Sequence, residues 1–347
     1  MSFDADVQLQ GDAIREALHR SHEGADALSR TINQLAADSQ RVIVVGMGSS
    51  LSASHFAVSR ITRSRPAELA EAGELLHYGT AGIEPGTLLV LVSQSGRSAE
   101  TLALARLAQR EGNARIVAVT NDPLSPLAVI ADFVLPILAG AEAAVATKTF
   151  MNTFVAMQAL ADILANDSEH YIAASIRLGL ADVIDDLVSS SEIAELAATR
   201  LAACSSLIVV GRGPALGSAE YGALVIAETA ATHAEAMPGG TFRHGPIEML
   251  GPDLGLIVLA PQGKTRELGV KLALDACDAG SPTWLIGDTT GISGHPELTL
   301  SQLPMLQEEY APLPLCVPIQ QFAASLARLK GREPGDLLSA TKVTEVQ

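Results

Sequence analysis

Polar side chains suited to binding an anion directly follow an apolar segment of the sequence. Residues 88–92 are apolar without interruption, which is typical of a parallel strand buried on both faces. They lead into Ser-Gln-Ser-Gly at 93–96, and the pattern from Ser98 to about Glu111 predicts a helix. Backbone N–H groups at such a turn point toward one spot, where the helix dipole adds partial positive charge. The turn is therefore suited to a phosphate, although serine caps at an ordinary turn produce the same pattern.

Length, composition and charge narrow the class of protein. The chain has 347 residues, of which 48% are hydrophobic and 3% aromatic, and this favours two domains built from helices packed on sheets. A formal net charge of −16 disfavours nucleic acid and anionic membranes as partners, whereas a small anion held by local dipoles stays compatible with it. Cys204, Cys277 and Cys316 have no CxxC spacing, so we expect neither a disulfide framework nor a metal site.

The N-terminus predicts no targeting segment. It begins MSFDADVQLQ, with acidic residues where a signal peptide needs basic ones. No apolar run in the sequence is long enough to span a bilayer. We therefore expect a cytoplasmic protein that does not contact a membrane.

Strand and helix patterns alternate along the first half of the chain. Short apolar runs predict strands at 42–45, near 75–78, and at 88–92, 116–119 and 133–137. Helical spacing predicts helices at about 12–38, 98–111, 125–130, 147–165 and 173–199. The alternation indicates a parallel sheet covered on both faces, with ligands at the carboxyl ends of the strands, where Gly46, Ser93 and Thr120 fall.

The second half of the sequence repeats the first. Residues 42–54, VIVVGMGSSLSAS, align without a gap on residues 207–219, LIVVGRGPALGSA. Further strands are predicted at 256–260, 283–286 and 313–317. We therefore predict two tandem, doubly wound, flavodoxin-like α/β domains over 29–170 and 171–330, with a helical segment over 1–28 before them and a tail over 331–347 after them.

The repeat also indicates one anion site per chain. Opposite the Ser-Gln-Ser-Gly turn, the second half has Pro261-Gln-Gly-Lys264, which lacks both serines, and proline has no N–H to donate. The GxG pairs at Gly46 and Gly211 do not continue to GxGxxG, and no acidic residue ends a following strand. We therefore expect no dinucleotide and no other cofactor.

Two further segments complete a recognisable pattern, ETAATHAEA at 228–236 and RHGP at 243–246. With them the chain resembles the double SIS (sugar isomerase) family, and most of all the isomerase portion of the glucosamine-6-phosphate synthases. The matching motifs occur in order as VGMGSS, SQSGRSAET, TND, ATKTF, VGRG, YGALVIAET, HAEA, RHGP and the C-terminal KVTE at 342–345. The likeness covers nearly the whole chain.

The resemblance implies a set of site residues for a hexose 6-phosphate. The residues implied to hold the phosphate are Ser93, Gln94, Ser95 and Ser98, and those implied to line the sugar are Ser49, Ser50 and Ala146. Glu228 is implied as the base that moves a proton between C1 and C2, His244 as the ring-opening group and Lys342 as the amine that reaches the carbonyl carbon. In the family the RHGP histidine serves the neighbouring subunit, so a homodimer is expected.

Each catalytic assignment has a simpler alternative. Glu228 could be an exposed face residue of a helix, His244 a turn cap and Lys342 a solvated tail lysine. Two departures from the synthases also matter, because no cysteine follows Met1 to hydrolyse glutamine and Val225 stands where the family often has lysine. We expect an isomerase and deaminase of an amino-sugar 6-phosphate such as glucosamine 6-phosphate. The alternatives are a deglycase for fructosamine-type 6-phosphates and a sugar-phosphate sensor without turnover.

Overall fold

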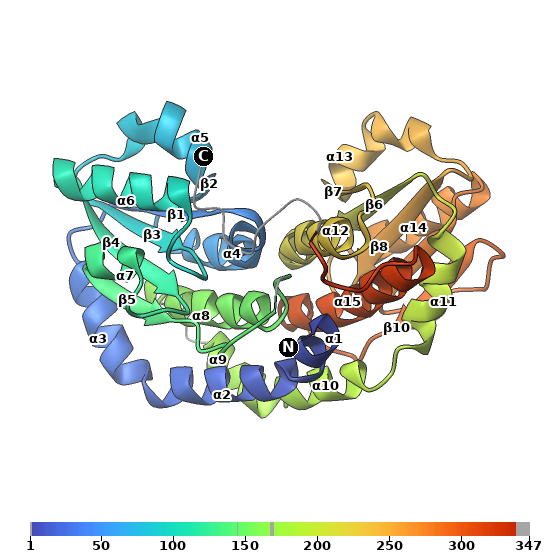
Figure 1. The fold of residues 1–347 in the computed structure, drawn as a ribbon, viewed down its shortest axis with the longest axis horizontal. Helices are drawn as coiled ribbons and strands as arrows, with labels where there is room; N and C mark the ends of the chain where they lie inside the picture. Colours follow the sequence, from blue (N-terminus) through green and yellow to red (C-terminus); the bar gives the residue numbers. More distant parts are fainter. Residues whose placement is uncertain (1, 144, 167–169, 338–347) are drawn as a thin grey trace. The chain divides into compact units, whose positions relative to one another are not determined.

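The computed structural model describes residues 2–143, 145–166 and 170–337, and within that part the chain divides into two compact units. The first unit comprises residues 11–142 and 148–181, and the second comprises residues 2–10, 143–147 and 182–337. Each unit contains one five-stranded parallel sheet with helices on both faces (Figure 1). The predicted α/β class, with two doubly wound sheets, is confirmed.

The first sheet has the strand order β2-β1-β3-β4-β5, with every pair parallel. Its strands are β1 (Arg41–Gly46), β2 (Ala67–Glu71), β3 (Thr87–Val92), β4 (Ala114–Thr120) and β5 (Phe133–Pro136). The helices on one face are α3 (Ala25–Leu35), α4 (Gly48–Ile61) and α8 (Lys148–Leu164), and those on the other are α5 (Ala72–Glu74), α6 (Ala99–Glu111) and α7 (Pro126–Ile130). This is the order of a flavodoxin-like sheet, in which ligands bind beyond the carboxyl ends of the strands.

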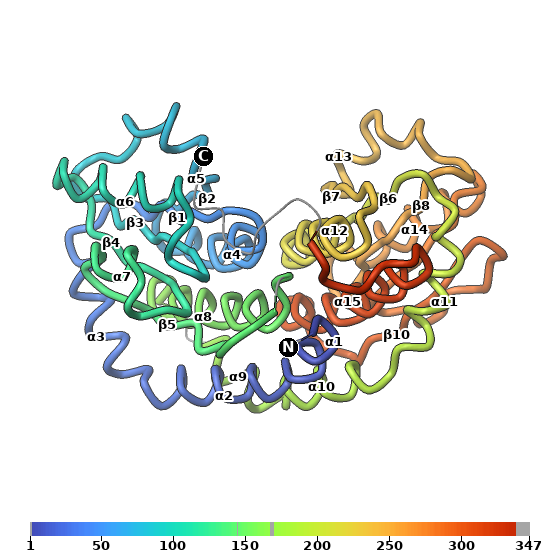
Figure 2. The backbone as a smooth tube through the Cα atoms, viewed as in Figure 1, coloured from blue at the N-terminus to red at the C-terminus, as the bar shows by residue number. Residues whose placement is uncertain are grey.

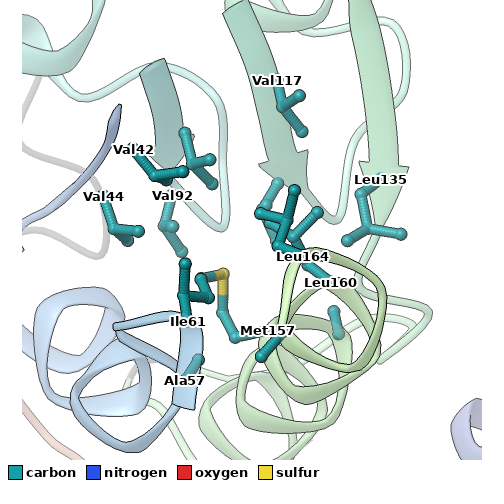
Figure 3. Close-up of a cluster of buried hydrophobic side chains, with 14 of the residues drawn as sticks. Val42, Val44, Ala57, Ile61, Val92, Val117, Leu135, Met157, Leu160 and Leu164 are labelled. Atoms are coloured by element: carbon teal, nitrogen blue, oxygen red, sulfur yellow. The ribbon is translucent and has the colours of Figure 1, made fainter. Parts of the chain in front are cut away.

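Alternate residues of each central strand enter the two apolar clusters on opposite faces of the first sheet. Val42 and Val44 of β1 face α4 and α8, whereas Ile43 faces α6. Figure 3 shows Val42 and Val44 beside Ile61 of α4 and Met157 of α8. Because both faces are covered, every residue of β3 is buried, and its sequence needs no polar alternation.

The second sheet has the same order of strands along the chain, β7-β6-β8-β9-β10. Its strands are β6 (Ser206–Gly211), β7 (Ala234–Pro238), β8 (Leu254–Ala260), β9 (Thr283–Gly287) and β10 (Leu298–Gln302). The helices on one face are α13 (Gly239–Arg243) and α14 (Arg266–Asp278), and those on the other are α11 (Glu192–Leu201), α12 (Leu216–Ala230) and α15 (Pro312–Leu329). Trp284 of β9 stacks on Phe322 of α15, with ring centroids 5.2 Å apart. In Figure 2 the segments of the first sheet are coloured blue to green and those of the second yellow to orange, because the two sheets come from different halves of the sequence.

The two GxG segments need glycine for the same structural reasons in both units. A Cβ at Gly46 would lie 2.8 Å from the backbone nitrogen of Leu51, and one at Gly211 would lie 2.5 Å from the carbonyl oxygen of Ala215. Gly48 and Gly213 have positive φ angles of 50° and 51°. The first glycine therefore permits the close approach of strand and helix, and the second permits the turn between them.

Two predicted strands are wrong. Residues 75–78 lie in a π-helical turn, η1 (Leu75–Gly79), and the strand is β2, whose sequence AELAE has two glutamates that suit a partly exposed edge and interrupt any apolar run. Residues 313–317 lie in α15 and not in a strand, and β10 is the edge strand instead. The apolar run in α15 reflects a helix buried on most of its surface, which a short window does not distinguish from a buried strand.

Two predicted helices are interrupted. The pattern over 12–38 forms α2 (Gln10–Glu23) and α3, which are separated at Gly24. The pattern over 173–199 forms α9 (Tyr171–Arg177), α10 (Leu180–Val188) and α11, and the first break follows Gly179 at a φ of 63°. One further helix, α1 (Phe3–Gln8), precedes α2 and packs on α15 in the second unit. Across the described residues, no helix combines the length and apolar character needed to cross a bilayer.

Candidate functional site

The candidate phosphate loop joins β3 to α6 in the first unit. The hydroxyl oxygens of Ser93 and Ser98 lie 3.1 Å apart, and Ser93 is buried whereas Ser98 is half-buried. Ser98 is the N-cap residue of α6, yet its side chain makes no capping hydrogen bond. The N–H groups of the first turn of α6 therefore keep their donor capacity for another acceptor.

The turn between β4 and α7 holds this loop in shape. The Gln94 carbonyl oxygen accepts hydrogen bonds from the backbone N–H of Asn121 at 2.9 Å and from the Thr120 hydroxyl at 3.1 Å. Gly96 has a φ of 61°, and a Cβ there would lie 2.1 Å from the Ser125 hydroxyl oxygen. Any larger residue at position 96 would displace the neighbouring turn, so this position requires glycine.

The loop also contains one cation, Arg97, which the sequence prediction did not use. Its guanidinium lies 3.3 Å from the Asp122 carboxylate, and both side chains are exposed. The hydroxyl of Ser95 accepts a hydrogen bond of 3.2 Å from the backbone N–H of Arg97. An arginine beside the Ser-Gln-Ser-Gly turn was the sequence signal for a positive charge at this loop.

Ser49 and Ser50 begin α4 at the same edge of the first sheet. β1 and β3 are neighbours in the sheet, and Gly46 pairs with Val92, so the loops that follow these two strands leave it at the same level. Ser49 is half-buried and Ser50 is buried, with 8% of its surface exposed. The structure therefore brings the two candidate sugar-lining serines and the candidate phosphate loop to one edge.

The corresponding loop of the second unit, between β8 and α14, already holds a carboxylate. The oxygens of Glu308, in η5 (Glu308–Tyr310), accept hydrogen bonds from the backbone N–H of Lys264 at 3.1 Å and from the Thr265 hydroxyl at 3.2 Å. A Cβ at Gly263 would lie 2.6 Å from the Glu308 side chain. An internal anion thus occupies the place that corresponds to the candidate phosphate loop.

Glu228 lies in the last turn of α12 and is half-buried. Desolvation by burial raises the pKa of Glu228 to about 7. Burial is the cause of this rise in pKa, and no hydrogen bond or charged group among the described residues contributes to it. The negative end of the helix dipole acts in the same direction on the pKa, and the fully buried Val225 one turn earlier supplies no charge that would lower it. This carboxyl group is therefore poised to exchange a proton near neutral pH.

The remaining candidate residues differ in setting. His244 is the exposed C-cap of α13 and precedes Gly245, which has a φ of 124°. The carbonyl oxygen of Ala146 accepts a hydrogen bond of 2.8 Å from the hydroxyl of Tyr221 on α12. Lys342 lies outside the described residues.

A model described as the SIS domain matches residues 35–165 and 200–283, which together make up more than half of the chain. The chain belongs to the SIS domain family. The two matched segments contain all five strands of the first sheet and the first three strands of the second, and the match ends at the first residue of β9.

Named relatives agree with the SIS assignment. The chain is 30% identical to a glutamine–fructose-6-phosphate aminotransferase (isomerizing) of Thermococcus kodakarensis, across 99% of this chain and 57% of that protein. This SIS chain therefore spans little more than half the length of that relative. Its fold resembles the C-terminal domain of a glucosamine-fructose-6-phosphate aminotransferase from Francisella tularensis, with a TM-score of 0.85, 20% identity and coverage of 96% and 98% of the two chains. It also resembles a glucosamine-6-phosphate deaminase from Thermotoga maritima, with a TM-score of 0.67, 19% identity and coverage of 97% and 99%.

The SIS site is built from hydroxyl, amide, carboxyl and backbone groups. Within the described ranges, no group of three or more His, Cys, Asp or Glu side chains is arranged to hold a metal ion. Glu308 and Tyr221 were not predicted from the sequence, although Tyr221 lies seven residues before Glu228 and so shares its face of α12. Hydroxyl and backbone N–H groups are donors of the kind that bind phosphate, and a carboxyl group of raised pKa is of the kind that transfers protons.

Proposed function

We propose that this chain is a sugar-phosphate isomerase that deaminates an amino-sugar 6-phosphate, with glucosamine 6-phosphate as the representative substrate. The observation that carries the proposal is the Glu228 carboxyl group, whose pKa burial raises to about 7 and which has no partner among the described residues. Family membership and the names of the relatives support the class of substrate. Release of nitrogen is the direction proposed, and one protein of similar fold is described as a glucosamine-6-phosphate deaminase.

Phosphate binding belongs to the β3–α6 loop in this proposal. The hydroxyls of Ser93, Ser95 and Ser98, the Gln94 side chain and the first-turn N–H groups of α6 are the donors for a dianion. These groups carry no formal charge, so they suit a chain with a net charge of −16. Ser49, Ser50 and Ala146 are proposed to line the sugar.

Glu228 is the proposed base that transfers the proton between carbon atoms. His244 opens the ring, and the Glu228 carboxylate then removes the proton from C2 of the open-chain aldehyde to form an enaminol. The proton on Glu228 exchanges with solvent, and Glu228 then protonates C1, which leaves an imine at C2. Addition of water to C2 and loss of ammonia give the ketose 6-phosphate, so water is the only co-reactant. Lys342 is proposed as the amine that contacts the carbonyl carbon.

Solvent deuterium incorporation into the recovered sugar phosphate tests the proposal. Wild-type enzyme incubated with glucosamine 6-phosphate in D₂O should release ammonia and place deuterium at C1. Glu228→Gln keeps the size of the side chain but cannot accept the proton, so the rate should fall by roughly a hundredfold or more with little change in substrate affinity. Exchange at the wild-type rate in the Gln variant would assign the base elsewhere, with Glu235 as the next candidate.

A substrate panel separates the alternatives. Hexosamine, N-acetylhexosamine and fructosyl-amino-acid 6-phosphates are each scored by release of ammonia or amine. Release only from the fructosyl compounds identifies a deglycase. Binding of these phosphates without exchange or release identifies a sensor, and the proposed enzymatic activity is then wrong.

A further inference from the structure

A chain of buried hydrogen bonds in the second unit ends on the backbone of residue 146. The Tyr221 hydroxyl donates to the Ala146 carbonyl oxygen at 2.8 Å and accepts from the Gln320 side-chain amide at 2.9 Å. The Gln320 carbonyl oxygen in turn accepts from the Gln10 side-chain amide at 2.9 Å. Tyr221 is 1% exposed, and Gln10 and Gln320 are fully buried.

These side chains come from three helices that are distant in sequence. Gln10 begins α2, Gln320 lies in α15 and Tyr221 lies in α12, the helix that ends with Glu228. Burying an amide or a hydroxyl without a partner is unfavourable, and the hydrogen bonds among these three side chains offset that cost. Ala146 is 75 residues from Tyr221 along the chain.

A second hydrogen bond joins the same segment to the N-terminal helix α1. The backbone N–H of Ala143 donates to the carboxylate of Asp6 at 2.7 Å, and Asp6 is fully buried in α1. The segment 143–147 is thus attached to the second unit at Ala143 and at Ala146. Both hydrogen bonds involve main-chain groups, the N–H of Ala143 and the carbonyl of Ala146. They therefore fix the position of the backbone without using the side chains of these two residues.

From these contacts we infer that Tyr221, supported by Gln320 and Gln10, is a positioning residue that holds the backbone at Ala146 in place for the sugar. The inference rests on the proposed function only for the ligand, because the hydrogen bonds themselves are independent of it. One helix, α12, then presents the proton-transferring carboxyl group at its end and orients a sugar-lining segment two turns earlier.

The test uses Tyr221→Phe, which removes only the hydroxyl, and Ser218→Ala as a matched control. The Ser218 hydroxyl is also buried on α12 and also donates to a backbone carbonyl, that of Pro312, at 2.8 Å. Hydrogen exchange is measured on the ligand-free protein for the amides of segment 143–147. Steady-state kcat and KM are measured with glucosamine 6-phosphate.

Tyr221→Phe should speed exchange in this segment about tenfold and raise KM about tenfold with kcat changed less than threefold, whereas Ser218→Ala should do neither. Gln320→Met removes the hydrogen bond from Gln320 to Tyr221 but leaves the Tyr221 hydroxyl in place. This variant should change exchange and KM in the same direction by a smaller factor. Wild-type exchange in Tyr221→Phe, or equal exchange in Ser218→Ala, would overturn the inference. Faster exchange with an unchanged KM would show that the segment does not serve the sugar, and this also overturns it. If the wild-type protein neither binds nor converts the sugar phosphate, the proposed function fails, and the exchange data still decide the positioning of the segment.

Discussion

A half-buried carboxyl group in the last turn of a helix is held away from its charged form by two physical effects. Burial removes water from the carboxylate, and the carbonyl groups at the end of α12 present partial negative charge. Glu228 has this setting, and its pKa is raised from an ordinary 4.5 to about 7. A base that must both take and return a proton at carbon works best at such a value.

The raised pKa predicts opposite pH dependences of activity and stability. Activity needs the carboxylate, so kcat/KM should rise about tenfold per pH unit below pH 7 and level off above it. The folded protein binds the Glu228 proton more tightly than the unfolded chain, so the free energy of unfolding should fall as pH rises from about 4.5 to 7.

Glu228→Gln provides the comparison for stability. Its unfolding free energy in urea should match that of the wild type near pH 4.5 and exceed it by roughly 1–3 kcal/mol at pH 8, because the variant has no charge to bury. A difference that does not change with pH would contradict the raised pKa.

If the candidate phosphate loop binds the substrate, substitution of Ser95 should weaken binding. Ser95→Ala should remove one charge-assisted hydrogen bond and weaken binding of the sugar phosphate by roughly 1.5–3 kcal/mol, measured by calorimetric titration. Ser59→Ala, on α4 and outside the loop, is the control, because among the described residues its hydroxyl bonds to the Phe56 carbonyl oxygen of its own helix. Equal affinities of the two variants would place the phosphate elsewhere.

At the scale of elements, the corresponding loops of the two sheets differ in the hydrogen bonds that they make to carboxylates of the chain. At the β3–α6 loop the Asp122 carboxylate pairs with the Arg97 side chain, and no carboxylate of the described residues accepts from the loop's serine hydroxyls. At the β8–α14 loop, Glu308 accepts hydrogen bonds from Lys264 and Thr265. Loss of the serines and the N–H at Pro261 is therefore accompanied by a carboxylate from η5. We propose that the first loop binds an external phosphate, whereas the Glu308 carboxylate of the chain itself occupies the second loop.

Glu308→Ala should reopen the second loop. The variant should lose roughly 1–3 kcal/mol of stability, and inorganic phosphate should restore part of it, because the anion can replace the carboxylate. Urea unfolding is compared in phosphate and in chloride at equal ionic strength. Glu309→Ala, in the same short helix, is the control, and an identical response of both variants to phosphate would contradict the prediction.

At the scale of the whole molecule, the exposure of His244 is consistent with the expectation that it serves a neighbouring subunit. The proposed homodimer would then assemble each site from Glu228 of one subunit and His244 of the other.

Mixing two inactive variants tests the proposed dimer. His244→Ala and Glu228→Gln should each lose most activity alone. After exchange of subunits, half of the dimers should be mixed and carry one intact site of two, so about a quarter of the wild-type rate should return. Sedimentation of the mixture confirms that dimers form. A fully active monomer, or no recovery after demonstrated exchange, would contradict the assignment.

Local sequence patterns determined much of the fold and the candidate site. The uninterrupted apolar run of β3 predicts a strand buried on both faces, and the paired GxG segments predict two similar units, because close approach and positive φ both require glycine. The turn at 93–96 and the helical position of Glu228 follow from the same local rules.

Tertiary structure alone decided the remaining features. The edge strand β2 has two glutamates in its sequence AELAE, because one side of an edge strand needs no apolar residues, and the apolar run in α15 could serve a strand or a buried helix equally well. Glu308 lies 44 residues from Lys264, and Tyr221 lies 75 residues from Ala146. A local pattern reports how deeply a residue is buried but not which distant residue it meets. Those partners, and the raised pKa of Glu228, depend on the packing of whole helices.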